Sequence, residues 1–242
     1  MVKAFQRRMK DSSMADNFFW DRSWKSLDQD KLSLYIENFD YSADPVIEFL
    51  HERGYNSLCD AGCGCGVYSL KLAKHGFSVS GFDISEDAVE RAKHLLSEGA
   101  YPTQDFRRAD ILTTGYTDGI FDAVVARDVL DHMAIRDGVA AVKELLRIVR
   151  PGGCVLITLD GTDKEYESEP HIVNTDGDYL FSGGKWNGMI FHPYSLEEIN
   201  RLVGGRDVKL MKANESGLLV VIEKGDASKR SGKNLGGILG DE

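Results

Sequence analysis

The sequence predicts an α/β fold with a doubly wound, mostly parallel sheet that carries helices on both faces. Apolar segments typical of buried strands alternate along the chain with segments whose apolar residues recur at helical spacing, and this alternation is typical of βαβ units. A glycine-rich stretch at residues 60–66 directly follows the first predicted strand. With 242 residues, 42% of them hydrophobic, the chain is long enough to bury the core of one such domain.

The first half of the predicted domain has a clearly marked opening helix. Asp44 is a favourable N-cap residue, Pro45 suits the first helical turn, and Gly54 is typical of a helix end. Further along, Ser85 is expected to cap a helix with one apolar face. The elements expected in this half are, in chain order, a helix over 44–54, a strand over 57–59, a helix over 67–75, a strand over 78–82 and a helix that begins after Ser85.

The second half continues the alternation and then departs from it. A Pro-Gly-Gly sequence at 151–153 predicts a turn between a helix and the next strand, and an Asp-Gly pair at 176–177 predicts a hairpin. Ser195 and Glu198 have the spacing of a capping box. The elements expected here are strands over 105–109, 121–126 and 154–159, a helix over 139–149, hairpin strands over 171–173 and 179–181, a helix after Ser195, and strands over 207–211 and 218–223.

These elements divide the chain into parts. Residues 1–43, called the cap below, mix charges with aromatic residues and are expected to form helices that pack on the main domain at 44–224. Residues 160–194, called the lid below, interrupt the strand–helix alternation before the last helix, and long insertions of this kind tend to be functional. Residues 225–242 are rich in Gly, Ser, Lys and Asp and are predicted to be disordered.

The charge and composition of the chain exclude several classes of partner. Its 39 acidic and 29 basic residues give a net charge of -10, the opposite of what a phosphate-binding surface needs, so no nucleic-acid partner is expected. No apolar run reaches the roughly 18 residues of a membrane-spanning helix, so no membrane partner is expected. The N-terminal residues lack the apolar core of a secretory signal, which predicts a cytoplasmic location in which the four cysteines stay reduced.

The glycine loop at 60–66 predicts a nucleoside ligand. In an open parallel sheet the turn after the first strand forms part of the ligand crevice, and glycines there let the backbone approach a bound molecule. Asp83 follows the second predicted strand, where an acidic side chain can accept hydrogen bonds from ribose hydroxyls. The dinucleotide pattern G-x-G-x-x-G/A would need Gly or Ala at 67, where this chain has Val, so an NAD-binding oxidoreductase is disfavoured but stays open.

Several motifs together resemble those of one enzyme family. They are Asp-Ala-Gly-Cys-Gly-Cys-Gly at 60–66, Phe-Asp-Ile-Ser at 82–85, Ala-Asp-Ile at 109–111, Phe-Asp-Ala-Val-Val at 121–125 and Leu-Leu-Arg-Ile-Val-Arg-Pro-Gly-Gly at 145–153. In order and spacing the chain resembles the class I S-adenosylmethionine-dependent methyltransferases, in particular those that act on small molecules. The resemblance implies a seven-stranded sheet in which the strand at 218–223 is antiparallel, S-adenosylmethionine as donor and S-adenosylhomocysteine as product.

The resemblance also implies which residues hold the donor. Asp83 would bind the ribose, Asp110 would accept from the adenine amino group, and the backbone at Arg127 would face the methionine ammonium group. Asp60, at the end of a strand, is expected instead to hold the loop through hydrogen bonds to backbone N–H groups. The full set of predicted cofactor-site residues is Asp60, Ala61, Gly62, Cys63, Gly64, Asp83, Ile84, Asp110, Ile111 and Arg127.

Methyl transfer is a direct displacement, so few side chains are needed beyond those that align the reactants and exclude water. His132 is the candidate general base, and its alternative role is to order its loop. The predicted acceptor-site residues are Trp20, Trp24, Asp128, Tyr166, Trp186 and His192, and their alternative role is packing within the cap and lid. A small-molecule acceptor is expected, whereas the acceptor atom and the oligomeric state stay open.

Two other functions remain as alternatives. A protein that binds the donor without catalysis, as a sensor or scaffold, would carry the same cofactor motifs. A zinc or redox site could use Cys59, Cys63 and Cys65, but their spacing supplies no fourth ligand, so no metal is expected. Cys63 and Cys65 lie ahead of a predicted helix, where a lowered thiol pKa is expected.

Overall fold

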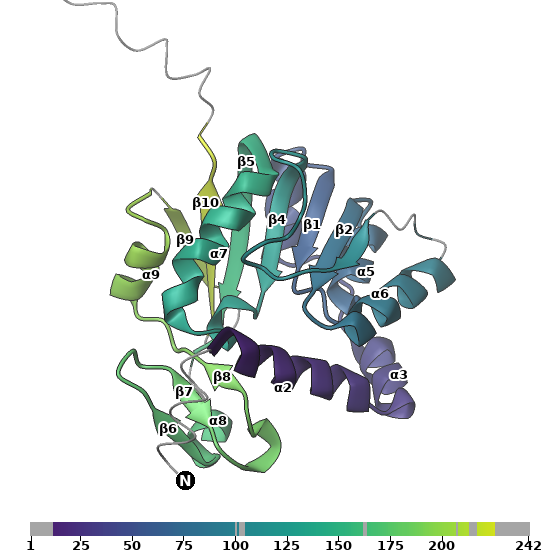
Figure 1. Ribbon diagram of the computed structural model, residues 1–242. Helices are drawn as coiled ribbons and strands as arrows, with labels where there is room; N and C mark the ends of the chain where they lie inside the picture. The colour runs from purple at the N-terminus through teal and green to yellow at the C-terminus, as the bar shows by residue number, and fades with distance from the viewer. Residues whose placement is uncertain are drawn as a thin grey trace, which may run out of the picture.

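The protein is described by a computed structural model that covers residues 12–99, 101, 105–161, 164–206, 208–212 and 217–225. Its centre is a seven-stranded sheet in the order β3-β2-β1-β4-β5-β10-β9 (Figure 1). Strand β10 is antiparallel to both β5 and β9, and the other neighbouring strands are parallel. The strands are β1 (Ser57–Ala61), β2 (Ser78–Asp83), β3 (Phe106–Arg108), β4 (Phe121–Arg127), β5 (Val149–Leu159), β9 (Val208–Lys212) and β10 (Leu218–Glu223). The predicted mostly parallel sheet, including the antiparallel strand at 218–223, is confirmed.

Helices cover both faces of this sheet. One core cluster joins the sheet to α4 (Pro45–Glu52), α5 (Val67–Lys74) and α6 (Glu86–Glu98), and a second joins it to α7 (Ile135–Ile148) and α9 (Leu196–Leu202). Successive residues of β1 enter opposite clusters, Leu58 the first and Cys59 the second, because side chains alternate across a strand. This two-sided burial explains why the central strands read as continuous apolar runs.

The predicted helix starts are confirmed by their capping contacts. The Asp44 carboxylate accepts from the backbone N–H groups of Val46 and Ile47 at 3.1 and 3.0 Å. Ser195 and Glu198 form the reciprocal hydrogen bonds of a capping box at the start of α9. These local contacts satisfy N–H groups that the first turn of a helix leaves without partners.

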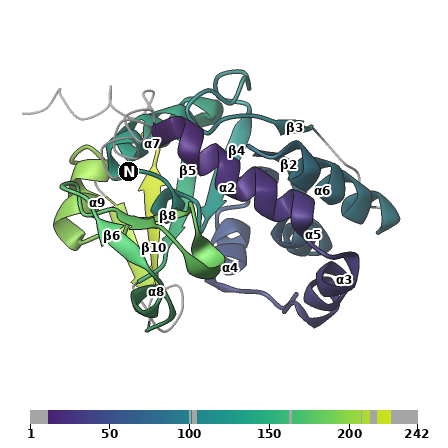
Figure 2. The same ribbon diagram turned by 60° about the horizontal axis from the view of Figure 1, so that its bottom comes forward.

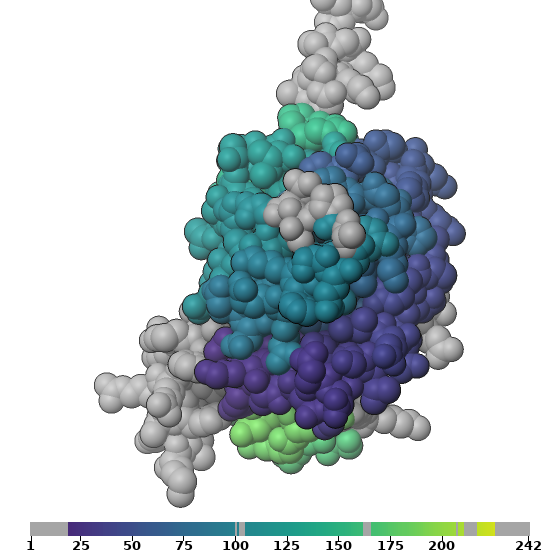
Figure 3. Space-filling model, turned by 90° about the vertical axis from the view of Figure 1, so that its right-hand side faces the viewer, coloured from purple at the N-terminus to yellow at the C-terminus, as the bar shows by residue number. Residues whose placement is uncertain are grey.

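The cap lies across the carboxyl ends of the strands. Its helices are α2 (Ser12–Ser26) and α3 (Gln29–Asn38), and α2 runs beneath the lower edge of the sheet in Figure 1 and across the front of the molecule in Figure 2. Seen from the side, the purple cap residues form a band between the teal main domain and the green lid (Figure 3). Arg22 donates to the Asn187 carbonyl at 2.7 Å, and Ser85 donates to Asp21 at 3.2 Å, so α2 contacts both the lid and the segment that follows β2.

The lid contains a small antiparallel sheet. It consists of α8 (Lys164–Ser168) and the strands β6 (His171–Val173), β7 (Tyr179–Phe181) and β8 (Ile190–Phe191), with His171 opposite Phe181. The predicted hairpin is confirmed, and its turn is held by Asn174, which accepts from the backbone of Asp176 and Asp178. The sequence missed β8 because a strand of two residues shows no period.

The prediction of a turn at 151–153 was wrong. Strand β5 begins at Val149 and continues through the Pro-Gly-Gly sequence, with an irregular register against β4 between Phe121 and Ala123. Gly152 has a φ of +78°, and a Cβ on Gly153 would lie 2.2 Å from the Asp122 carbonyl oxygen, so the glycines permit a bulge with close strand contact. The rule that Pro and Gly interrupt regular secondary structure does not distinguish such a bulge from a turn.

Two expectations about the chain ends lie outside the described residues, namely the start of the cap at 1–11 and the tail at 226–242. Within the described ranges, every helix falls short of the combined length and hydrophobicity that a bilayer crossing requires.

Candidate functional site

A cavity of about 390 Å³ opens at the carboxyl ends of β1, β2 and β4, under the cap. The strand order reverses between β1 and β4, since the chain moves outward through β2 and β3 on one side and through β5 on the other. Crevices at such reversal points are the usual ligand sites of open α/β sheets. The cavity is lined by the glycine loop, by residues that follow β2, β3 and β4, and by aromatic side chains of the cap.

The glycine loop is shaped by two close approaches. Gly64 has a φ of +51°, and a Cβ there would lie 2.7 Å from Cζ2 of Trp24, so the cap packs directly on the loop backbone. Gly66 has a φ of +85°, and its Cβ would lie 2.7 Å from Cα and Cβ of Ala92 on α6. Glycine is required at both positions because other residues would combine left-handed strain with overlap.

Asp83 lies at the floor of the cavity, at the end of β2. Its carboxylate accepts from the backbone N–H groups of Gly64 at 3.0 Å and Ser85 at 2.9 Å, which holds it against the loop. Burial raises the pKa of Asp83 above its ordinary value, and these hydrogen bonds act in the opposite direction. The remaining lone pairs can accept from hydroxyl groups of a ligand.

A second carboxylate, that of Asp110, also lines the cavity. Asp110 accepts from the Leu112 N–H at 2.9 Å and lines the cavity with the apolar side chains of Ile84 and Ile111. This combination of one acceptor between apolar walls suits a planar heterocycle with an amino group. The four residues predicted for ribose and adenine are therefore brought together.

The strand β4 ends in charged residues at the centre of the cavity. The Arg127 guanidinium lies 4.9 Å from the Tyr68 ring centroid and 5.8 Å from that of Phe39, both of which line the cavity. Asp128 adopts a φ of +53°, and its carboxylate accepts from the Thr158 hydroxyl at 2.6 Å. Burial and the nearby Asp44 carboxylate raise the pKa of Tyr68, so its hydroxyl stays protonated.

Asp60 and Ala61 lie inside β1 and do not line the cavity. The Asp60 carboxylate accepts from the Ser69 hydroxyl at 2.5 Å, which ties β1 to α5. The expectation that Asp60 would bind backbone N–H groups of the loop was therefore wrong, although it does hold the following helix. Burial raises the pKa of Asp60 to about 6, against the opposing effect of the Ser69 hydrogen bond.

His132 lines the cavity together with aromatic side chains of the cap. His132 lies in a short 3-10 helix, Leu130–His132, with its ring centroid 5.1 Å from that of Trp20 and 5.7 Å from that of Phe191. Its Nδ1 atom is buried and makes no hydrogen bond within the described part of the chain. Together with Trp20, Trp24 and Asp128, His132 lines the cavity as predicted.

The other predicted acceptor residues lie outside the cavity lining. Tyr166 and Trp186 pack with Phe19, Phe181 and Phe191 in an aromatic cluster between the lid and α2. In the structure Tyr166 and Trp186 have their alternative role, which is packing within the cap and lid. The aromatic side chains of the insertion bury their surface against one another because the main core lies out of their reach.

His192 is also placed away from the cavity. Only 1% of it is exposed, and its Nδ1 lies 2.9 Å from the Asp178 carboxylate. Asp178 in turn accepts from the Ile135 N–H at 3.1 Å, so the pair connects the lid to the start of α7. The prediction of an acceptor contact for His192 was wrong in this structure, because its ring is enclosed by the lid.

Sequence reasoning missed several lining residues, namely Tyr35, Phe39, Tyr68, Met133 and Asp137. Tyr35 and Phe39 are four residues apart in a segment expected to be helical, which was a usable signal that they share one face. Tyr68 gave no comparable signal because no pattern in the sequence distinguished the cavity side of its helix.

The expectation of a lowered thiol pKa at Cys63 and Cys65 was wrong. Burial raises the pKa of the Cys63 thiol well above its ordinary value and that of Cys65 to about 11. All four cysteines are buried and free. Among the described residues the one group of side chains close enough to share a metal ion contains no cysteine and consists of Asp128, Asp131 and Asp160.

Comparison with known proteins supports the fold and classifies the central segment of the chain. Residues 59–157 match a family model described as a methyltransferase domain. The chain also superposes on the 1,6-didemethyltoxoflavin-N1-methyltransferase of Burkholderia thailandensis with a TM-score of 0.64 at 15% identity, over 90% of each chain. Residues 59–157 thus form a methyltransferase domain, and the chain has the fold of the class I S-adenosylmethionine-dependent methyltransferases. The motifs that suggested this family in the sequence are those that line or support the cavity.

Curated relatives match the central part of the chain. The 2-methyl-6-phytyl-1,4-hydroquinone methyltransferase of Synechocystis is 36% identical over 115 residues, which is 47% of this chain and 35% of that protein. A ubiquinone biosynthesis O-methyltransferase of Nitrosomonas europaea is 33% identical over 127 residues, or 51% of each protein. The chain thus matches between a third and about half of the length of these relatives.

Proposed function

We propose that this methyltransferase domain transfers a methyl group from S-adenosylmethionine to a nucleophilic atom of a small molecule. The observation that carries the proposal is the convergence of the glycine loop, Asp83 and Asp110 on one cavity, within the segment that matches a methyltransferase domain. A nucleoside with an amino-acid tail needs acceptors for its ribose and base and a backbone that it can approach closely. This cavity supplies all three.

The cavity residues fit the donor as follows. Asp83 keeps lone pairs for ribose hydroxyls after accepting from two backbone N–H groups. Asp110 offers an acceptor for the adenine amino group, and the backbone at 62–64 and at Arg127 would receive the methionine end. When bound, S-adenosylmethionine supplies an electrophilic methyl group on a positively charged sulfur.

The chain's own contribution to such a reaction is alignment and the exclusion of water. Trp24 packs on Gly64 and Trp20 packs on His132, so α2 covers the cavity from the cofactor loop to the acceptor end. The unpartnered Nδ1 of His132 can accept a proton from an acceptor hydroxyl or ammonium group. Asp128 and Asp137 add negative charge to the cavity lining, and the Arg127 guanidinium, 3.5 Å from the Asp128 carboxylate, offsets part of it.

The proposed acceptor class rests on the aromatic side chains that line the cavity. Trp20, Tyr35, Phe39 and Tyr68 present aromatic surface, which favours a planar, ring-bearing small molecule. The relatives are named for a phytyl hydroquinone and for ubiquinone biosynthesis, and the structural neighbour for didemethyltoxoflavin. These names support the proposed class without specifying the acceptor atom.

Calorimetry with S-adenosylmethionine, S-adenosylhomocysteine and NAD tests the donor assignment. We expect the first two to bind the wild type and Asp83→Asn to weaken both by about 10- to 100-fold, because a charge-assisted acceptor of ribose hydroxyls is lost. Asp176→Asn, an exposed carboxylate of the lid, is the matched control and should bind as wild type does. A wild type that binds NAD and ignores the methyl donor would refute the proposal.

Transfer assays separate the enzyme from a sensor. We expect radiolabelled methyl transfer to at least one member of a panel of hydroquinones and amino-heterocycles, and His132→Ala should lower kcat by about 100-fold while donor affinity changes little. His132→Gln, which keeps a polar group of similar size, should not restore the rate if a proton is moved. Tight donor binding with no transfer to any acceptor would favour the sensor or scaffold alternative.

A further inference from the structure

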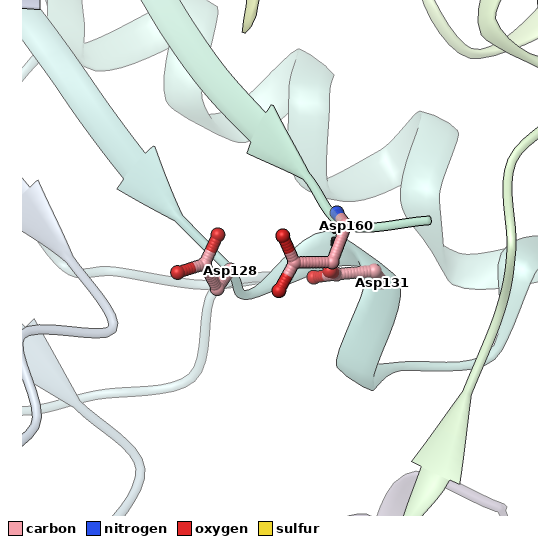
Figure 4. A group of neighbouring side chains, drawn as sticks. All are labelled: Asp128, Asp131 and Asp160. Carbon is pink, nitrogen blue, oxygen red and sulfur yellow. Dashed lines mark hydrogen bonds between the residues drawn. The ribbon is translucent and has the colours of Figure 1, made fainter. Parts of the chain in front are cut away.

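Three carboxylates gather beyond the ends of β4 and β5. Asp128 follows β4, Asp160 follows β5, and Asp131 lies in the 3-10 helix between them (Figure 4). One oxygen from each lies within 4.8 Å of the others. Oxygen ligands about 2.0–2.6 Å from a shared Mg²⁺, Mn²⁺ or Ca²⁺ ion are separated by distances of this size.

Asp131 has an unsatisfied oxygen inside this cluster. Its side chain is fully buried, and Oδ2 accepts from the Asp160 N–H at 2.9 Å. Its Oδ1 is buried and has no hydrogen-bond partner among the described residues. A buried carboxylate oxygen with no donor is costly, and a proton, an ordered water or a cation beside it would lower this cost.

Neighbouring groups hold Asp128 in position within the cluster. The Thr158 hydroxyl donates to the Asp128 carboxylate at 2.6 Å, and Thr158 itself accepts from the Asp128 N–H at 3.0 Å. The Arg127 guanidinium approaches Asp128 only to 3.5 Å and lines the cavity, so it compensates only part of the Asp128 charge. A divalent cation between the carboxylates would supply the remaining compensation.

We propose that Asp128, Asp131 and Asp160 bind one hard divalent cation, such as Mg²⁺ or Mn²⁺, next to the acceptor end of the cavity. A ligand set made only of carboxylate oxygens selects this class of ion over zinc. This proposal departs from the sequence-based expectation that no metal is bound, which considered only the cysteines. Asp128 and His132 both line the cavity, so an oxygen of the acceptor is within reach as a further ligand.

The role of the ion in catalysis rests on the proposed function. A hydroxyl group bound to a divalent cation loses its proton more readily, which would activate an oxygen acceptor next to the methyl donor. Binding of the ion itself depends on neither donor nor acceptor. The two claims can therefore fail separately.

The test is a titration of the metal-stripped full chain with Mn²⁺ in the absence of donor and acceptor. The electron paramagnetic resonance signal of free Mn²⁺ reports how much of the ion stays unbound. We expect one ion per chain, displaced by excess Mg²⁺, and at least about 10-fold weaker binding in Asp131→Asn and in Asp160→Asn. Asp137→Asn removes a carboxylate that lines the cavity outside the cluster and should leave Mn²⁺ affinity unchanged.

Circular dichroism of each variant shows whether it folds. If Asp131→Asn does not fold, Asp160→Asn alone tests the cation site. Absence of Mn²⁺ binding by the wild type, or equal binding by wild type and both cluster variants, overturns the proposal. A wild type that binds Mn²⁺ but not S-adenosylmethionine retains the cation site and refutes the proposed function. A wild type that binds S-adenosylmethionine but not Mn²⁺ refutes the cation site and retains the proposed function.

Discussion

Gly66→Ala should destabilise the protein much more than Gly76→Ala, although the two glycines have almost the same backbone conformation. Their φ values are +85° and +89°, and each lies at one end of α5. A Cβ on Gly66 would lie 2.7 Å from Cα and Cβ of Ala92, whereas a Cβ on Gly76 would meet nothing within 4 Å. The pair therefore separates backbone strain from close packing of α5 on α6.

The magnitudes follow from these two contributions. A left-handed conformation costs a residue with a Cβ about 1–2 kcal/mol, and the lower entropy of the unfolded alanine chain offsets about 0.4–1 kcal/mol of it. Overpacking against a backbone atom adds about 1–3 kcal/mol, because α6 can yield only by shifting. We expect the free energy of unfolding to fall by about 1 kcal/mol in Gly76→Ala and by about 2–4 kcal/mol in Gly66→Ala.

Urea unfolding followed by circular dichroism measures both values, provided that the slope with denaturant stays constant. Donor affinity, measured by calorimetry, should fall in Gly66→Ala because a displaced α5 carries the glycine loop with it, and should be unchanged in Gly76→Ala. If the two variants differ by less than about 0.5 kcal/mol, close α5–α6 packing is not what requires glycine at position 66, and the reasoning fails.

Two further predictions concern the sheet and its supporting contacts. Glu144 accepts from Thr114 and from Arg147 at 2.7–2.8 Å, and the Arg147 hydrogen bond lowers the pKa of Glu144 from 4.5 to about 2. The stabilising effect of the Glu144 carboxylate should be complete above pH 4.5 and disappear as the pH falls towards 2. Glu144→Gln should therefore lower the free energy of unfolding by about 1–2 kcal/mol near pH 7 and by little at pH 2. Urea unfolding at several pH values measures this difference. The Tyr116 hydroxyl lies 3.0 Å from the Gly81 carbonyl oxygen and 2.7 Å from that of Asp105, so Tyr116→Phe should cost about 1 kcal/mol and speed amide exchange in β3.

Each of these predictions has an outcome that would contradict it. A Glu144→Gln cost that does not change with pH would mean that the carboxylate charge is not what stabilises the network. For Tyr116→Phe the control is Tyr101→Phe, since the Tyr101 ring is partly buried and lies beside Gly99. Equal amide exchange in β3 of both variants would show that the Tyr116 hydroxyl does not hold that strand.

Local patterns predicted the order of the elements well because they depend on neighbours in the chain. Asp44, Ser85 and Ser195 cap helices wherever those helices pack, and the alternation of buried strands with amphipathic helices leaves few possible topologies. The glycine loop and Asp83 were located because a strand end, a turn and a helix start are adjacent in sequence. The bulge in β5 was missed because it depends on the neighbouring strand β4, which no local pattern includes.

The sequence by itself determined the parallel α/β fold and the position of the glycine loop, and its motifs indicated a methyltransferase domain. The tertiary structure decided which side chains face the cavity: it placed Trp24 on Gly64, enclosed His192 beside Asp178, and brought Asp131 and Asp160 together across a sequence separation of 29 residues. The physical reason is that periodicity and capping report short-range interactions, whereas these contacts form only when distant segments pack and exclude water between them.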